Sequence, residues 1–293
     1  MKNIFNLLIV GLATLLLAAC TDVVQIKLDE GSKLYVIDAF VNNLRSPQTI
    51  RVVTNDSYFS NRDAPPVTNA TVILKDLTIG MQYAFVYSDR GNYIFNPATT
   101  DTISKINHQY ELNVTIDGVT YTSLATQKRT AKIDSISAVY NDGTSGFGPP
   151  QPSYFCGLYA KDRADDNTDY YWVKTFRNDT LFSGSNDINL SIDGTNGAVT
   201  GLSVDSTDFT PPITLLGFKR YQSGNSCKVE IHSISHNTYF FLVQAVNQIS
   251  NGGLFATTPE NVKTNIVTPK DAKTKAIGWF NMATVATKTK VIP

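Results

Sequence analysis

The sequence lacks most features that mark enzymes and nucleic-acid-binding proteins. No lysine-rich or arginine-rich run is present, and 25 basic residues balance 25 acidic ones. Nucleic acid and anionic membrane surfaces are therefore disfavoured as partners. The chain has no nucleophile elbow, no phosphate-binding glycine loop and no zinc-protease motif. These absences predict a protein without enzymatic activity, and they leave no catalytic residues to nominate.

Long apolar runs are also missing, with one exception at the start of the chain. After Lys2 an apolar stretch extends from Ile4 to Ala19. A membrane-spanning helix needs about 20 predominantly apolar residues, so this stretch is too short to cross a bilayer comfortably. One basic residue, a short apolar core and small residues before a cleavage site are typical of a secretory signal peptide. We therefore expect residues 1–19 to be a signal peptide.

The signal peptide ends in Leu17-Ala18-Ala19-Cys20. These residues resemble the lipobox of bacterial lipoproteins, in which the cysteine thiol is linked to diacylglycerol before cleavage. Two or more acyl chains anchor a protein stably, whereas a single chain binds only marginally. We expect Cys20 to be the site of lipid attachment and residues 20–32, which are polar, to be a short tether. The alternative is an ordinary secreted protein, which the polar segment after Cys20 disfavours.

Cysteine is scarce, and only Cys156 and Cys227 remain after Cys20. An exported protein reaches a compartment in which disulfides persist. Both residues lie in segments with strand character, so the sequence permits a Cys156–Cys227 disulfide. Two separate buried thiols are an equal alternative, because the sequence does not show whether their Cα atoms approach within bridging distance.

Stretches of helix-forming residues are few, and β-forming residues are abundant instead, with 14 tyrosines and 15 phenylalanines. In Tyr110–Ile116 apolar and polar residues alternate strictly, and Asp117-Gly118 then favours a type I′ turn into a second strand. Short strands separated by turns predict a β-sandwich over residues 33–132. The predicted strands are Leu34–Val41, Thr49–Thr54, Thr71–Lys75, Gln82–Tyr87, Asn92–Phe95, Tyr110–Ile116 and Val119–Leu124.

Residues 133–293 are predicted to form a second β-rich domain with one helix. Apolar residues recur at helical spacing between Tyr239 and Ile249, with Ser235 as N-cap and Asn251-Gly252 as a stop signal. The predicted fold class is mainly β, with two sandwich-like domains and one amphipathic helix packed on the second sheet. The strands expected here are Tyr154–Ala160, Tyr170–Phe176, Ile188–Ile192, Ile213–Phe218, Cys227–Ile234, Ile277–Ala283 and Val285–Ile292.

Candidate metal ligands and partner contacts are few. His232 and His236 are four residues apart, but they straddle a predicted strand–helix boundary, so no metal site or other cofactor is predicted. Phe147 lies between two glycines in the proline-bounded loop of residues 141–152. It is a candidate anchor for a partner protein, or alternatively it packs between the two domains.

Two sets of motifs resemble known families. Val67–Val72, Ser88–Tyr93 and the hairpin Tyr110–Thr122 together resemble the transthyretin-like or carboxypeptidase-regulatory-like sandwich. A second set, in the C-terminal half, resembles a family of Bacteroidota envelope lipoproteins that carry a domain of unknown function. The second set consists of Asp169-Tyr170-Tyr171-Trp172, Gly253-Leu254-Phe255, Pro259-Glu260-Asn261-Val262, Asn265-Ile266 and Ile277-Gly278-Trp279-Phe280.

The second resemblance implies an outer-membrane lipoprotein, often encoded beside TonB-dependent transporters, with no activity attached to it. The expected partners are the membrane, through the lipid, and an outer-membrane β-barrel, with the solute unknown. Only Asp22 follows Cys20 closely, so the periplasmic and the surface face both stay open. The leading hypothesis is a non-enzymatic accessory or binding lipoprotein. A structural or assembly factor of the cell envelope and an unrecognised hydrolase are the alternatives.

Overall fold

The computed structural model describes residues 31–57, 60, 62–98, 102–103, 105–144, 150–161, 168–192, 215–251 and 262–293. Cys20 and Phe147, two of the candidate residues, lie outside this set. The described part is mainly β, as the sequence predicts, and the predicted strands lie close to their expected positions, but the strands Lys132–Asn141 and Thr180–Leu181 were not predicted. No helix among the described residues is long and apolar enough to cross a membrane.

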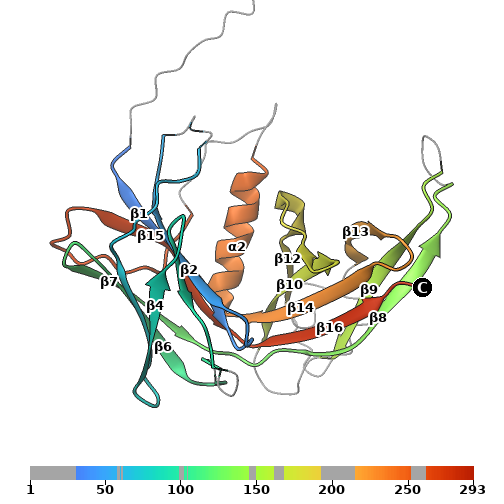
Figure 1. Cartoon of the computed structure of the whole chain (residues 1–293), viewed down its shortest axis with the longest axis horizontal. Helices are drawn as coiled ribbons and strands as arrows, with labels where there is room; N and C mark the ends of the chain where they lie inside the picture. Colours follow the sequence, from blue (N-terminus) through green and yellow to red (C-terminus); the bar gives the residue numbers. More distant parts are fainter. Residues whose placement is uncertain are drawn as a thin grey trace, which may run out of the picture. The chain divides into compact units, whose positions relative to one another are not determined.

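Eight strands form one hydrogen-bonded series in the part of the molecule on the left of Figure 1. β4 pairs with β3 up to Phe85 and with β5 from Val86, so the series bends over between these strands. The two end strands, β7 and β15, contact each other and complete a sandwich. In order, the strands are β15 (Lys275–Ala283), β1 (Leu34–Asn42), β2 (Gln48–Thr54), β5 (Asn92–Phe95), β4 (Met81–Tyr87), β3 (Thr71–Asp76), β6 (Gln109–Ile116) and β7 (Val119–Thr126).

Strict alternation along the strands builds the core of this sandwich. Every second residue of β6, beginning with Tyr110, is buried, as its apolar–polar pattern predicts. The β6–β7 turn has positive φ at both Asp117 (+49°) and Gly118 (+83°). This is the conformation that a type I′ hairpin requires, so the hairpin prediction is confirmed.

Two smaller sheets enclose a second core. One consists of β11 (Thr180–Leu181), β10 (Tyr170–Arg177), β14 (Ser226–Ile234) and β16 (Val285–Val291), with β12 (Asn189–Ile192) also paired to β10. A short 3₁₀ turn, η1 (Ser185–Asp187), precedes β12. The other consists of β13 (Leu215–Tyr221), β9 (Ser153–Lys161) and β8 (Lys132–Asn141). Leu158 of β9, Val173 of β10 and Ile231 of β14 are fully buried in this second core.

The predicted helix is α2 (His236–Ile249), and its predicted N-cap is confirmed because the Ser235 side chain accepts a hydrogen bond from the Thr238 N–H. The helix packs on two sheets rather than one. The ring of Phe241 stacks on Trp279 of β15 with centroids 4.4 Å apart, and Tyr239 contacts Tyr170 of β10. The helix therefore bridges the first sandwich and the second β-rich part.

The predicted division at residue 132 needs a correction. β1 pairs in parallel with β15 along its whole length, from Leu34 opposite Lys275 to Asn42 opposite Ala283. Phe280 and Met282 of β15 are buried in the core of the first sandwich. Residues 33–132 therefore do not complete that sandwich alone, and residues 33–56 and 61–293 form one compact unit. The pairing joins strands more than 200 residues apart, which no local pattern in the sequence reveals.

Candidate functional site

The chain passes between the first sandwich and the second β-rich part at three connections, and hydrogen bonds tie these together. The hydroxyls of Ser233 and Thr284 both donate to the Lys128 carbonyl, at 2.9 and 2.6 Å. The Ser233 N–H donates to the Thr284 carbonyl at 2.9 Å, and Gln127 Nε2 donates to Thr284 Oγ1 at 2.8 Å. The β7–β8, β14–α2 and β15–β16 connections therefore form one cross-linked junction.

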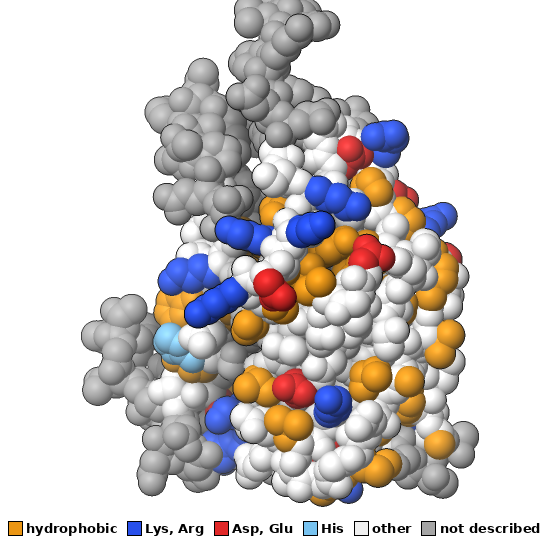
Figure 2. Space-filling view, turned by 90° about the vertical axis from the view of Figure 1, so that its left-hand side faces the viewer, with side chains coloured by type: hydrophobic (Ala, Val, Ile, Leu, Met, Phe, Trp, Pro, Cys, Tyr) orange, Lys and Arg blue, Asp and Glu red, His pale blue; other side chains and the backbone are white. Residues whose placement is uncertain are grey.

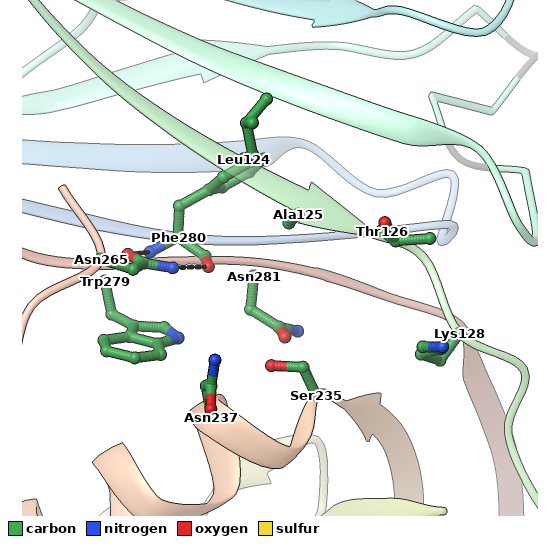
Figure 3. Close-up of a pocket in the computed structure, with 10 residues that line it drawn as sticks. All are labelled: Leu124, Ala125, Thr126, Lys128, Ser235, Asn237, Asn265, Trp279, Phe280 and Asn281. Atoms are coloured by element: carbon green, nitrogen blue, oxygen red, sulfur yellow. Dashed lines mark hydrogen bonds between the residues drawn. The ribbon is translucent and has the colours of Figure 1, made fainter. Parts of the chain in front are cut away.

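A pocket of about 320 Å³ lies beside this junction (Figure 3). We call it the junction pocket. Its walls come from the end of β7, the start of α2, β15 and the segment that precedes β15. The lining residues are Leu124, Ala125, Thr126, Lys128, Ser235, Asn237, Asn265, Trp279, Phe280 and Asn281.

Hydrogen bonds hold the wall between α2 and β15 in place. Trp279 Nε1 donates to Thr238 Oγ1 at 2.9 Å, and Thr238 Oγ1 donates to Asn281 Oδ1 at 2.9 Å. The side chain of Asn265 pairs with the backbone of β15 as a neighbouring strand would. Its Nδ2 donates to the Phe280 carbonyl and its Oδ1 accepts from the Phe280 N–H, both at 2.8 Å. Figure 3 shows both bonds. The wall is therefore preorganised.

The lining of the junction pocket is largely polar. It offers amide, hydroxyl and indole groups, and the only ionisable side chain among the lining residues is that of Lys128. Figure 3 shows the Asn237 and Ser235 side chains directed from α2 towards Asn281 across the pocket. Such a lining donates and accepts hydrogen bonds but holds no acid–base pair.

A separate charged cluster lies on β10 and β14. His232 Nε2 is 3.0 Å from Glu230 Oε2, and Lys174 lies opposite Glu230 in the strand pairing. Burial lowers the pKa of His232 to about 4, although the Glu230 hydrogen bond opposes this shift. Burial alone would raise the pKa of Glu230, but the hydrogen bond from His232 and the charges of Lys228 and Lys174 lower it overall. A neutral imidazole therefore donates to an ionised carboxylate.

The structure does not bring His232 and His236 together as metal ligands. His232 bonds Glu230, whereas the ring of His236 packs against Tyr170 and Phe240. Within the described ranges, no group of three or more His, Cys, Asp or Glu residues is arranged to hold a metal ion.

Cys156 on β9 and Cys227 on β14 are buried free thiols in the second core, so the structure contains no disulfide between them. They are not separate, however. A hydrogen bond between the two thiols, together with burial, raises the pKa of Cys156. Of the two alternatives that the sequence left open, the structure shows unbridged thiols, with the two side chains in contact.

The junction pocket was not predicted from the sequence. Its residues come from four separate stretches of the chain, and asparagine and serine in loops and caps give no catalytic signature. The available signal was the resemblance itself, since Asn265 and the stretch Ile277–Phe280 belong to its motifs and contribute to the pocket wall.

Comparisons with known proteins identify a family. No curated protein matches the chain. A crystal structure of the FN1-FN3 domains of chicken CNTN1 is weakly similar, with 10% sequence identity, a TM-score of 0.24, and coverage of 70% of this chain and 60% of that one. The chain thus spans less than two thirds of that structure. Residues 21–289 match a family model described as a domain of unknown function, DUF4249. The protein therefore belongs to the DUF4249 family.

Proposed function

We propose that this protein is a non-enzymatic lipoprotein of the outer membrane, acting as an accessory or binding component of a TonB-dependent transporter system. The observation that carries the proposal is the junction pocket. Its wall is fixed by hydrogen bonds, and its lining offers polar contacts without an acid–base pair. Binding sites commonly fix the orientation of a ligand through a small number of placed polar groups beside apolar and aromatic ones, and Trp279, Phe280 and Leu124 supply the apolar part here.

The anchoring part of the proposal rests on the sequence. Cys20 follows a lipobox-like stretch, and the folded part begins at Lys33. An extended residue spans about 3.5 Å, so a tether of residues 20–32 reaches at most about 45 Å from the lipid. Confinement near the bilayer raises the effective concentration of the protein for neighbouring membrane proteins. Even a weak contact with a β-barrel would then be well occupied.

Affinity purification from native outer membranes tests the proposed partnership. The tagged, lipidated full-length protein is extracted in mild detergent, and its partners are identified by mass spectrometry. We expect a TonB-dependent β-barrel to be enriched over an unrelated tagged lipoprotein. Recovery of the protein alone would contradict the partnership and leave a free-standing binding module.

A pair of matched variants tests whether the junction pocket takes part in the contact with the β-barrel. Asn237 lines the pocket in the first turn of α2, whereas Asn247 is exposed in the last part of the same helix. Asn237→Trp should fill the pocket and lower barrel recovery severalfold, and Asn247→Trp should leave recovery unchanged. Equal recovery with both variants would assign the contact to another surface.

A structural or assembly role is the second candidate, and one observation favours it. Leu124 of β7 and Val267 are 55% and 61% exposed. Thr122 pairs with Val267 in an antiparallel bridge, so Leu124 and Val267 lie close together on one face of the sheet. Exposed apolar neighbours are typical of protein contacts. Enrichment of envelope proteins other than a transporter in the purification would favour this role.

A further inference from the structure

We infer that one end of the first sandwich binds anionic phospholipid head groups directly. The end in question is where β1 and β15 both begin. It carries Lys33, immediately before β1, Lys270 and Lys273 in the loop that leads into β15, and Lys275, the first residue of β15. We call these four residues the lysine end. The inference rests on the proposed lipid anchoring, and it adds a second membrane contact to it.

The fold assembles the lysine end from residues far apart in the sequence. Leu34 and Lys275 are partners in the parallel β1–β15 pairing, which brings Lys33 next to the loop. The loop is closed by a 2.9 Å hydrogen bond from the Ala276 N–H to Thr268 Oγ1. It is also tied to β7, because Tyr121 Oη donates to the Thr274 carbonyl at 2.7 Å. The lysines are therefore presented on a fixed frame.

The four lysine side chains are available to an external anion. All four residues are exposed, and none of them takes part in an ion pair with any residue that the structure describes. Figure 2 shows lysine and arginine side chains gathered on the upper half of the side of the molecule that carries this loop. Patches of one charge attract surfaces of the opposite charge.

Three aspartates lie close to the lysines and limit the excess of positive charge. Asp271 belongs to the same loop, and Asp117 lies in the β6–β7 turn near Tyr35. The Asp117 carboxylate accepts hydrogen bonds from Asn69 Nδ2 at 2.9 Å and from Tyr35 Oη at 3.5 Å. Asp56 lies opposite Lys33, because Asn55 pairs with Leu34, but Arg62 forms an ion pair with it at 3.2 Å. Among the described residues, four lysines and Arg62 against three aspartates therefore leave a net positive end. We therefore expect weak, salt-sensitive binding that supplements the acyl chains.

The position of the tether favours a membrane over other anionic partners. Lys33 directly follows the proposed tether in the sequence, so the lysine end is joined to the proposed acyl chains by residues 20–32 alone. Each basic residue held near an anionic bilayer strengthens binding severalfold. Acyl chains combined with a basic patch anchor more firmly than acyl chains alone.

Vesicle sedimentation of the mature chain without acyl groups tests this inference. The protein, residues 20–293 with Cys20→Ser, is mixed with phosphatidylcholine vesicles that contain or lack phosphatidylglycerol. We expect binding only to the phosphatidylglycerol vesicles, with loss of binding at high salt. Replacing Lys270, Lys273 and Lys275 by glutamine should lower the partition coefficient at least about tenfold.

A matched triple variant controls for net charge. Lys105, Lys132 and Lys290 lie outside the lysine end, and Lys105→Gln, Lys132→Gln and Lys290→Gln should together retain most of the binding. Thermal melts of both triple variants should match that of the parent protein. Equal binding to both vesicle types, or equal loss in both triple variants, would overturn the inference. Barrel recovery in the purification above does not depend on this result, so the two proposals can fail separately.

Discussion

The buried His232–Glu230 pair gives this protein a specific sensitivity to acid. His232 is 5% exposed, and burial lowers the pKa of its imidazole to about 4. In the unfolded chain the same imidazole takes up a proton near pH 6.5. The unfolded state therefore binds more protons between these values, and stability falls as the pH drops from about 6.5 to about 4.

The size of the effect follows from the two pKa values. One pKa unit corresponds to about 1.4 kcal/mol, so the loss of stability is about 2 kcal/mol at pH 5 and about 3 kcal/mol at pH 4. For a domain of this size, 2 kcal/mol lowers the Tm by roughly 4–8 °C. The pKa of Glu230 is lowered as well, so its stabilising contribution is present above about pH 4.5 and is lost below it. Burial also raises the pKa of Asp38 near Lys174, so this carboxyl contributes a change of the opposite sign as the pH falls. The contribution of His232 is therefore the difference between the wild type and a variant without this imidazole, measured between pH 7.5 and pH 5.

Urea unfolding at pH 7.5 and pH 5, for the wild type and two variants, measures this contribution. His232→Gln keeps a side-chain donor for Glu230 but does not titrate, so its stability should fall about 2 kcal/mol less than that of the wild type. His236→Gln alters an exposed histidine and should behave like the wild type. If His232→Gln loses as much stability as the wild type between the two pH values, the assignment of a buried neutral imidazole is wrong.

Three further predictions concern the fold. Gly278 has φ +119°, and a Cβ atom there would collide with the β1 backbone, so Gly278→Ala should lower the free energy of unfolding by at least about 3 kcal/mol. Gly118→Ala, at φ +83° in open space, should cost only about 1 kcal/mol in the same urea titration. Cys156 and Cys227 should both be alkylated after unfolding without reductant, and a mass shift only after reduction would contradict the free thiols. Protease cleavage within residues 145–149 should leave both fragments in one gel-filtration peak, because β15 completes the first sandwich; separate peaks would contradict that pairing.

The sequence predicted the local elements well, because each is encoded by neighbouring residues. Alternation in Tyr110–Ile116 and the Asp117-Gly118 pair identified the hairpin, and Ser235 identified the start of the helix. Strand character in Ile277–Ala283 was also recognised. The pairing partner of that strand was not recognised. Periodicity shows which face of a strand is buried, but it does not show with which other strand it pairs.

Neither the junction pocket nor the lysine end was predicted from the sequence, and the reason is the same for both. The β1–β15 pairing brings the lysine end together, and the hydrogen-bonded connections around Thr284 lie beside the junction pocket. Lys33 and Lys275 lie far apart in the sequence, so a search for basic runs does not detect the cluster of lysines that the β1–β15 pairing brings together. Asn281 belongs to no recognised motif, and the Asn265-Ile266 motif gives no indication of a pocket. The role of both asparagines becomes visible only through their hydrogen bonds.

Fatty-acid labelling in cells shows whether acyl chains on Cys20 hold this protein at a membrane. Cells that express the wild type, Cys20→Ala or Cys156→Ala are fed an alkyne analogue of a fatty acid, and the purified proteins are examined for label. The wild type and Cys156→Ala should be labelled equally, and Cys20→Ala should carry no label. Equal labelling of Cys20→Ala, or an unlabelled wild type, would contradict the lipid anchor and the membrane proposals that depend on it.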